Sequence, residues 1–88
     1  MRFVWDERKR RTNLRDHKLD FLDAPQVFAG PTVTYEDDRF AYGEQRFVTL
    51  GFLNGVAVSI QGEFVLGRKI KIVKENSISS EHLAANPV

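Results

Sequence analysis

Three polar side chains near the start of the chain recur at the spacing of one helix face. Lys9, Asn13 and His17 stand at positions i, i+4 and i+8, with Arg8, Arg10, Arg11 and Arg15 beside them. A basic face of this kind can bind the phosphates of RNA, and an imidazole can carry a proton near neutral pH. The alternative is a solvated helix whose Asn13 and His17 bond to nearby backbone.

A second pair of charged residues leads from an acidic stretch into a β-rich run. Glu44 and Arg46 are two positions apart, so on an extended chain their side chains share a face. In a binding cleft, Arg46 would stabilise charge that develops on a phosphate, and Glu44 would orient the guanidinium. The alternative is a structural ion pair at the start of a strand.

A third group of cations lies near the end of the chain, at Arg68, Lys69 and Lys71. These side chains either extend a surface for RNA or protect the edge of a sheet from pairing with other chains.

Several kinds of chemistry find no support in the residues present. Cysteine is absent and only two histidines occur, so thiol nucleophiles, zinc–thiolate sites and a serine–histidine triad are not expected. His17 has no partner at a known metal-ligand spacing, and no glycine-rich loop could cradle a phosphate. We therefore predict neither a metal nor a cofactor. No apolar run approaches the ~20 residues that span a bilayer, and no signal peptide is visible, which predicts a cytoplasmic location.

The amino-terminal half reads as a strand followed by two helices. Residues 1–5 alternate as in a short strand, and Asp6 is a typical cap for a helix that extends to residue 18. A second helix follows, and Asp23 is its favoured cap because Pro25 then falls in the first turn. Gly30 and Pro31 end it.

The remaining chain reads as strands. We predict strands at 32–35, 45–52, 56–60 and 69–73, with a polar loop at 36–44 and a two-residue hairpin turn at Asn54 and Gly55. The fold class is thus α+β, with two amino-terminal helices packed on an antiparallel sheet of about four strands. For this chain of 88 residues we predict a single domain at residues 1–76. Residues 77–88 are predicted to form a short tail that is frayed or weakly helical.

Two blocks of sequence resemble the BrnT toxin family and together span roughly residues 3–60. The first is Phe3-x-Trp5-Asp6-x-x-Lys9-x-x-x-Asn13-Leu14-x-x-His17-x-x-x-Phe21-x-x-Ala24-x-x-Val27-Phe28. The second is Asp38-Arg39-x-x-x-Gly43-Glu44-x-Arg46-Phe47-Val48-Thr49-Leu50-Gly51. The resemblance implies a RelE-like two-layer fold and a type II toxin, a ribonuclease that stops translation. It also implies a DNA-binding antitoxin, encoded nearby, through which the toxin reaches operator DNA.

The resemblance also implies roles for particular side chains. Such ribonucleases need no metal, because the 2′-hydroxyl of the RNA attacks the adjacent phosphate while the protein supplies charge and proton transfer. Arg46 is then the first choice for stabilising the phosphate, and His17 or Glu44 carries the proton. The predicted contacts to RNA are Lys9, Asn13, Arg39, Arg68 and Lys71. Trp5, Phe21 and Phe28 match positions that we interpret as core.

The end of the chain departs from the family pattern. The family usually continues with Ile-Arg-Ile-Ile-Ser-x-Arg-x-Ala and a basic helix, whereas this chain has Ile70-Lys71-Ile72-Val73-Lys74-Glu75-Asn76. Lys71 keeps the charge of the first arginine but loses its bidentate fork. The alternatives are therefore a catalytically weak member that still binds its antitoxin, or a non-enzymatic RNA-binding module. One hypothesis for the altered ending is a truncation or frameshift, which the other reading frames of the gene would test.

Two further expectations concern the arrangement in space. Lys9, Arg46 and Lys71 should converge on one concave wall that holds the scissile phosphodiester. A small sheet with an exposed edge should also favour self-association of the free protein into a homo-oligomer.

Overall fold

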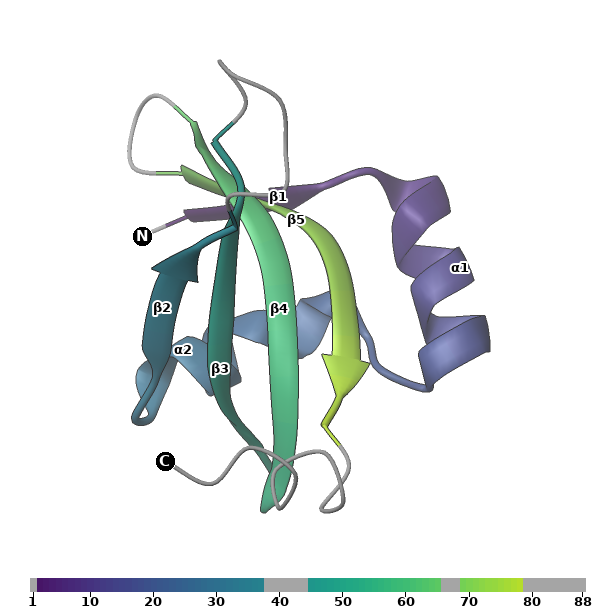
Figure 1. The fold of residues 1–88 in the computed structure, drawn as a ribbon. Helices are drawn as coiled ribbons and strands as arrows, with labels where there is room; N and C mark the ends of the chain where they lie inside the picture. The colour runs from purple at the N-terminus through teal and green to yellow at the C-terminus, as the bar shows by residue number, and fades with distance from the viewer. Residues whose placement is uncertain (1, 38–44, 66–68, 79–88) are drawn as a thin grey trace.

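The computed structural model describes residues 2–37, 45–65 and 69–78, which form a five-stranded sheet and three short helical segments (Figure 1). In chain order these elements are β1 (Arg2–Trp5), α1 (Glu7–His17), the 3-10 helix η1 (Phe21–Asp23), α2 (Ala24–Ala29), β2 (Val33–Glu36), β3 (Phe47–Leu53), β4 (Val56–Val65) and β5 (Lys69–Ser77). None of the helices in these ranges is long and apolar enough to cross a membrane. The α+β class and the two-layer arrangement are as predicted.

The sheet is mixed, which corrects the predicted antiparallel sheet of about four strands. Its order is β1-β5-β4-β3-β2, and the four strands from β2 to β5 form an antiparallel meander. β1 joins the outside of β5 in parallel, with Phe3 opposite Ile70 and Trp5 opposite Ile72. The alternating pattern of residues 1–5 predicts a strand but carries no information about its partner or direction.

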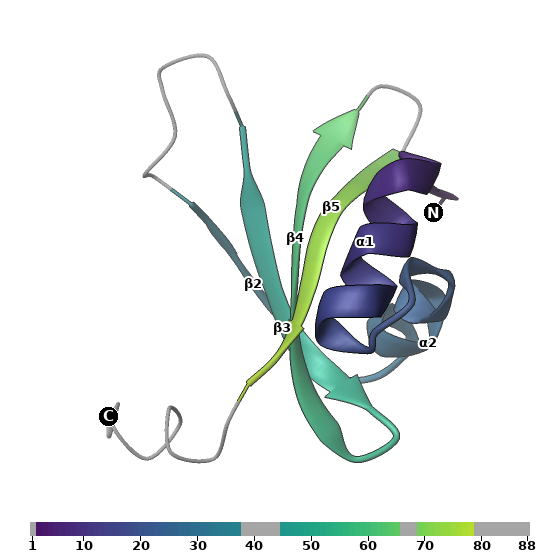
Figure 2. The ribbon, with the colours of Figure 1, turned by 90° about the vertical axis from the view of Figure 1, so that its right-hand side faces the viewer.

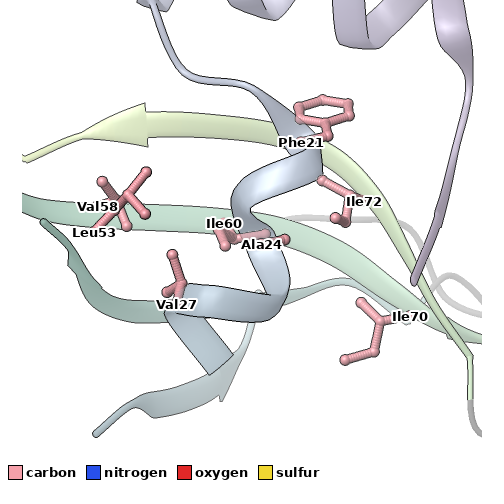
Figure 3. Close-up of a cluster of buried hydrophobic side chains, with 8 residues drawn as sticks. All are labelled: Phe21, Ala24, Val27, Leu53, Val58, Ile60, Ile70 and Ile72. Carbon is pink, nitrogen blue, oxygen red and sulfur yellow. The ribbon is translucent and has the colours of Figure 1, made fainter. Parts of the chain in front are cut away.

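Both main helices lie on the same side of the sheet, α2 across its face and α1 beside the edge of β5, and no helix of the described residues lies on the other face (Figure 1 and Figure 2). The core fills the space between the two layers, where Phe21 and Val27 are fully buried against side chains of β3, β4 and β5 (Figure 3). Trp5 and Phe28 pack against this cluster while partly buried, so the three aromatic residues assigned to the core are confirmed there. We call the opposite surface the helix-free face.

The first helix begins where the sequence predicts. The carboxylate of Asp6 accepts hydrogen bonds from the backbone N–H groups of Arg8 and Lys9, at 2.8 and 3.3 Å. The bond from Lys9 has the largest effect and that from Arg8 the next, and together they hold the pKa of Asp6 below its ordinary value. Lys18 ends the helix in the left-handed conformation, and its N–H reaches the carbonyl oxygen of Leu14.

The second helix has two steps. Asp20 caps the 3-10 turn, accepting a 3.0 Å hydrogen bond from the N–H of Leu22, and α2 then starts with Pro25 in its first turn. Asp23 occupies the predicted cap position of α2 but makes no side-chain cap bond. The 3-10 turn already satisfies backbone groups at this end, so a second cap is not needed.

The hairpin between β3 and β4 is confirmed, because Asn54 and Gly55 both have positive φ, at 51° and 81°. The strands around it are longer than predicted. β4 continues to Val65 and β5 to Ser77, beyond their predicted ends at residues 60 and 73, so residue 77 of the predicted tail is strand. Ile78 follows the strand. The rest of the predicted tail, residues 79–88, lies outside the described residues.

Close packing of α2 on the sheet depends on Gly51 of β3. A Cβ atom at this position would stand 2.7 Å from Cγ1 of Val27 and 3.1 Å from Cγ2 of Thr32. The absence of a side chain thus lets α2 approach the sheet.

Candidate functional site

An open groove of about 400 Å³ runs between α1 and β5. Its walls carry the cations Arg8 and Lys9 from the helix and Lys74 from the strand. The other described residues that line it are Thr12, Asn13, Asp16, His17 and Val73. The helical residues fall at positions 8, 9, 12, 13, 16 and 17, a pattern that fits one side of an α-helix.

The helix is fixed beside β5 by Asn13, whose side chain is 5% exposed. β1 pairs with β5 only as far as Ile72, so the later residues of β5 would present an unpaired edge. Oδ1 of Asn13 accepts a 3.0 Å hydrogen bond from the backbone N–H of Glu75 on that edge. Nδ2 donates to the carbonyl oxygen of Leu19, also at 3.0 Å. Both ends of the amide are therefore bonded to backbone.

A separate ion-pair network fixes the rotation of α1. The guanidinium of Arg10 lies 2.8 Å from Glu7 and 3.0 Å from Asp20, and the indole N–H of Trp5 donates to Glu7 at 3.1 Å. The hydrogen bond from Arg10 holds the pKa of Glu7 below its ordinary value. Arg10 is thereby directed away from the groove, and Arg8 and Lys9 remain on the groove side.

The groove is cationic. Arg8, Lys9 and Lys74 face a single carboxylate among its described lining residues, that of Asp16. Arg15 lies 3.0 Å from this carboxylate and holds its pKa below the ordinary value, so Asp16 remains ionised and partly compensated. The summed field therefore favours an anionic ligand.

β5 is bulged at Val73, next to Lys74. Gln61 of β4 pairs with Lys74, whereas the next residue, Gly62, pairs with Ile72, which leaves Val73 without a partner. Gln61 and Glu63 both point to the helix-free face, so their partners Lys74 and Lys71 share that face although they are three positions apart. The bulge thus connects the groove with the cations of the helix-free face.

Arg46 and Lys71 lie on the helix-free face. Nε of Arg46 is 2.7 Å from Oε1 of Glu63, and the pair is about three-quarters buried. Glu63 in turn stands opposite Lys71 on the neighbouring strand. One carboxylate therefore lies between two cations.

A carboxyl group is buried behind the groove. The side chain of Glu75 is 0% exposed, and neither of its oxygens has a hydrogen-bond partner among the described residues. Burial raises its pKa to about 7, and the nearby carboxylates of Asp23 and Asp20 add to this shift. No group of carboxylates and imidazoles among the described residues has an arrangement suited to a metal ion.

The model of a known family matches residues 5–73, which is most of the chain, and it describes BrnT, the ribonuclease toxin of type II toxin–antitoxin systems. The chain belongs to the BrnT family. Its fold is similar to the crystal structure of the Brucella abortus ribonuclease toxin BrnT, at 26% identity and a TM-score of 0.73. The similarity covers 91% of this chain and 99% of that one. Among curated proteins, none matches significantly. As a type II toxin, this BrnT chain has an antitoxin as its partner.

Most residues that line the groove of this BrnT chain lie within the range that the family model matches, and one lies just beyond it. Lys9, Asn13 and His17 fall within the matched range, whereas Lys74 follows its last residue, Val73. The match to the family model thus ends inside the groove, one position before the residue that supplies its strand-side cation.

The predicted site residues separate into three groups in this BrnT chain. Lys9 and His17 line the groove, and Asn13 forms its wall but is bonded to backbone. Arg46 and Lys71 are neighbours on the helix-free face, and neither is among the described residues that line the groove. The prediction that Lys9, Arg46 and Lys71 share one concave wall is therefore wrong. Lys9 lies in the groove, Arg46 and Lys71 lie on the helix-free face, and Lys74 lies between the two groups. Arg39, Glu44 and Arg68 lie outside the described residues.

Two participants are missed by reasoning from the sequence. Lys74 is missed because regular alternation along β5 predicts that Lys74 and Lys71 point to different faces of the sheet. The bulge at Val73 turns Lys74 to the same face as Lys71. Glu63 is missed because its pairing with Arg46 depends on the register of β3 and β4. The cation at position 74 is visible in the sequence, but its direction is not.

Proposed function

We propose that this chain is a metal-independent endoribonuclease that acts in the cytoplasm, inhibits translation and is neutralised by a DNA-binding antitoxin. RNA is its substrate, and operator DNA is reached only through the antitoxin. Membership of the BrnT family supports the class of activity. The observation that carries the proposal is the open groove with cations on both walls and one imidazole.

The groove supplies what RNA cleavage without a metal requires. Lys9 and Lys74 hold a phosphate from opposite walls, and Arg8 adds a third positive charge. The 2′-oxygen of the ribose attacks the phosphorus, and the bond to the 5′-oxygen of the next nucleotide breaks. His17 takes the proton of the 2′-hydroxyl and returns it to the departing 5′-oxygen, so the products are a 2′,3′-cyclic phosphate and a 5′-hydroxyl.

The cations of the helix-free face extend the binding path. RNA that leaves the groove at Lys74 next meets Lys71, the following cation along the same face of β5. Arg46 lies outside the groove, so it reaches the reacting phosphate only if its guanidinium leaves Glu63 and turns toward Lys74; the contact would then strengthen as negative charge develops. Asn13 acts as a positioning residue, since its amide fixes α1 and so the direction of Lys9 and His17.

Cleavage of a short RNA in the presence of EDTA tests the proposal. His17→Ala and Lys9→Ala should each lower the rate at least about 100-fold, the usual effect of losing a proton carrier or a phosphate contact. Arg11→Ala is the matched control, because Arg11 is exposed on the same helix but does not line the groove. Wild-type rates in both groove variants would show that cleavage occurs elsewhere.

A second candidate function is a catalytically weak toxin that still binds its antitoxin. The observation that favours it is the end of the family match at Val73, inside the groove. This candidate predicts tight antitoxin binding with little RNA cleavage and no growth arrest on induced expression. A non-enzymatic RNA-binding module predicts salt-sensitive binding without growth arrest.

A further inference from the structure

Four apolar side chains form a continuous patch on the helix-free face at the β2 end of the sheet. They are Val33 and Tyr35 of β2 and Leu50 and Phe52 of β3, and we call them the β2–β3 patch. The two threonine hydroxyls at positions 34 and 49 lie 2.8 Å apart on the helix side, so the flanking residues of both strands point the other way.

The patch is open to solvent. Val33 is 65% exposed, Phe52 57% and Tyr35 50%, whereas five apolar residues on the other face of β3 to β5 are buried in the core. β2 is also an edge strand of only four residues, paired on one side with β3 among the described residues. Contiguous apolar surface next to a sheet edge is typical of an interface with another polypeptide.

The patch is continuous with the proposed RNA path. Across the sheet, Tyr35 pairs with Val48, Val48 with Gln61, and Gln61 with Lys74, which lines the groove. Lys71 lies one row away on the same face. A ligand that covers this row therefore meets apolar side chains at one end and cations at the other.

We infer that the β2–β3 patch is the docking surface for the antitoxin, through a segment with apolar side chains for the patch and carboxylates for Lys71 and Lys74. The antitoxin is the partner that the family supplies, and its charge would complement the lysines. Bound there, the segment covers the path from the groove and blocks RNA. This blocking role rests on the proposed function, whereas the contact itself does not.

The composition of the patch favours a protein over RNA. Nucleobases stack on aromatic rings that stand among cations, but here Arg46 just before β3 is paired with Glu63, and the lysines are on β5, three strands away from Tyr35. Between the exposed rings lie the aliphatic side chains of Val33 and Leu50, which offer bases neither stacking nor hydrogen bonds. These side chains suit the apolar centre of a protein interface with a charged rim.

Affinity for the purified antitoxin, measured by titration calorimetry, tests this assignment. Tyr35→Asp and Phe52→Asp should each weaken binding at least about 30-fold, as expected for an interface hot spot. Leu22→Asp is the matched control, since Leu22 is 56% exposed but belongs to η1, in the helical layer, and should change affinity less than about twofold. Tyr35→Ser and Phe52→Ser provide milder variants if an aspartate prevents folding, which thermal unfolding will show.

RNA cleavage by the same variants separates this surface from the proposed activity. The patch variants should cleave RNA at the wild-type rate while escaping inhibition by the antitoxin. Unchanged antitoxin affinity in all four variants would overturn the docking surface. If antitoxin binding stays intact while RNA cleavage is lost, the patch binds RNA instead. If antitoxin binding stays intact while self-association is lost, the patch binds a second copy of the chain. A wild-type chain that binds antitoxin but cleaves no RNA would instead refute the proposed function.

Discussion

Asn13 closes the free edge of β5 by accepting a hydrogen bond from the backbone N–H of Glu75, 62 positions further along the chain. With its second bond to the carbonyl oxygen of Leu19, this one side chain joins α1, the link to η1 and the last strand. A helix is thus placed where a sixth strand would otherwise pair, and the groove forms beside it.

The first prediction concerns this amide. Asn13→Ala should lower the free energy of unfolding by about 2–4 kcal/mol, because it leaves a buried N–H and a buried carbonyl oxygen unpaired. Thr12→Ala, at the adjacent exposed position, should change stability by less than about 0.5 kcal/mol. Urea denaturation of both variants measures the difference. Equal, small effects would show that water replaces the amide without cost.

Glu75 gives the second prediction, which concerns pH. Its pKa of about 7 in the folded chain exceeds the ordinary value of 4.5. Between these two pH values the folded state therefore holds a proton that the unfolded state has released. Stability from this group is fully present below pH 4.5 and falls as pH rises toward and past 7, by up to about 3 kcal/mol.

Glu75→Gln should remove this dependence, because an amide cannot ionise. The variant should be more stable than wild type at pH 8 by about 2–3 kcal/mol and closely similar at pH 4. Glu36→Gln, at an exposed carboxyl of β2, should retain the wild-type dependence. Thermal unfolding of the three proteins across this pH range measures it. Parallel curves for Glu75→Gln and wild type would show that folding does not raise the pKa of this carboxyl.

The parts of the fold that the sequence predicts are those controlled by neighbouring residues. Asp6, Pro25 and the Asn54–Gly55 pair act on backbone within a few positions, so one helix start, one first turn and the hairpin are predicted correctly. The parallel pairing of β1 with β5 joins distant segments, and alternation alone does not encode it. The length of β5 is missed because its residues 74–77 are polar and pair with β4.

The candidate site shows the same division. Lys9 and His17 share a groove because helical spacing places them together, and this is readable from the sequence. Lys74 shares a face with Lys71 only through the bulge at Val73, and Arg46 meets Glu63 only through the register of the meander. Asn13 has the right position for the groove, but its burial and its backbone bonds depend on where β5 ends.

The third prediction compares two arginines of α1. Arg8 lines the groove and Arg11 does not, so only Arg8 is placed to contact an RNA phosphate. Arg8→Ala should reduce the slope of log affinity against log salt concentration by about 0.7, the value for one phosphate contact on a single strand. Arg11→Ala should leave the slope unchanged. Fluorescence anisotropy with an uncleavable 2′-O-methyl oligonucleotide provides the measurement, and equal slopes for both variants would remove the groove from the RNA path.

The ion pair of Arg46 and Glu63 gives the last prediction, in which stability and cleavage separate two roles. Because the pair is mostly buried, a double-mutant cycle with alanine at both positions should give a coupling of about 1 kcal/mol in the free energy of unfolding. If Arg46 also stabilises the phosphate, Arg46→Ala should lower the cleavage rate at least about 100-fold, whereas Glu63→Ala should retain it because the guanidinium is still present. A purely structural pair would make the two single variants equally active when both are folded, since either substitution removes the same contact. Single-turnover cleavage at a temperature well below the unfolding midpoint of each variant distinguishes these outcomes.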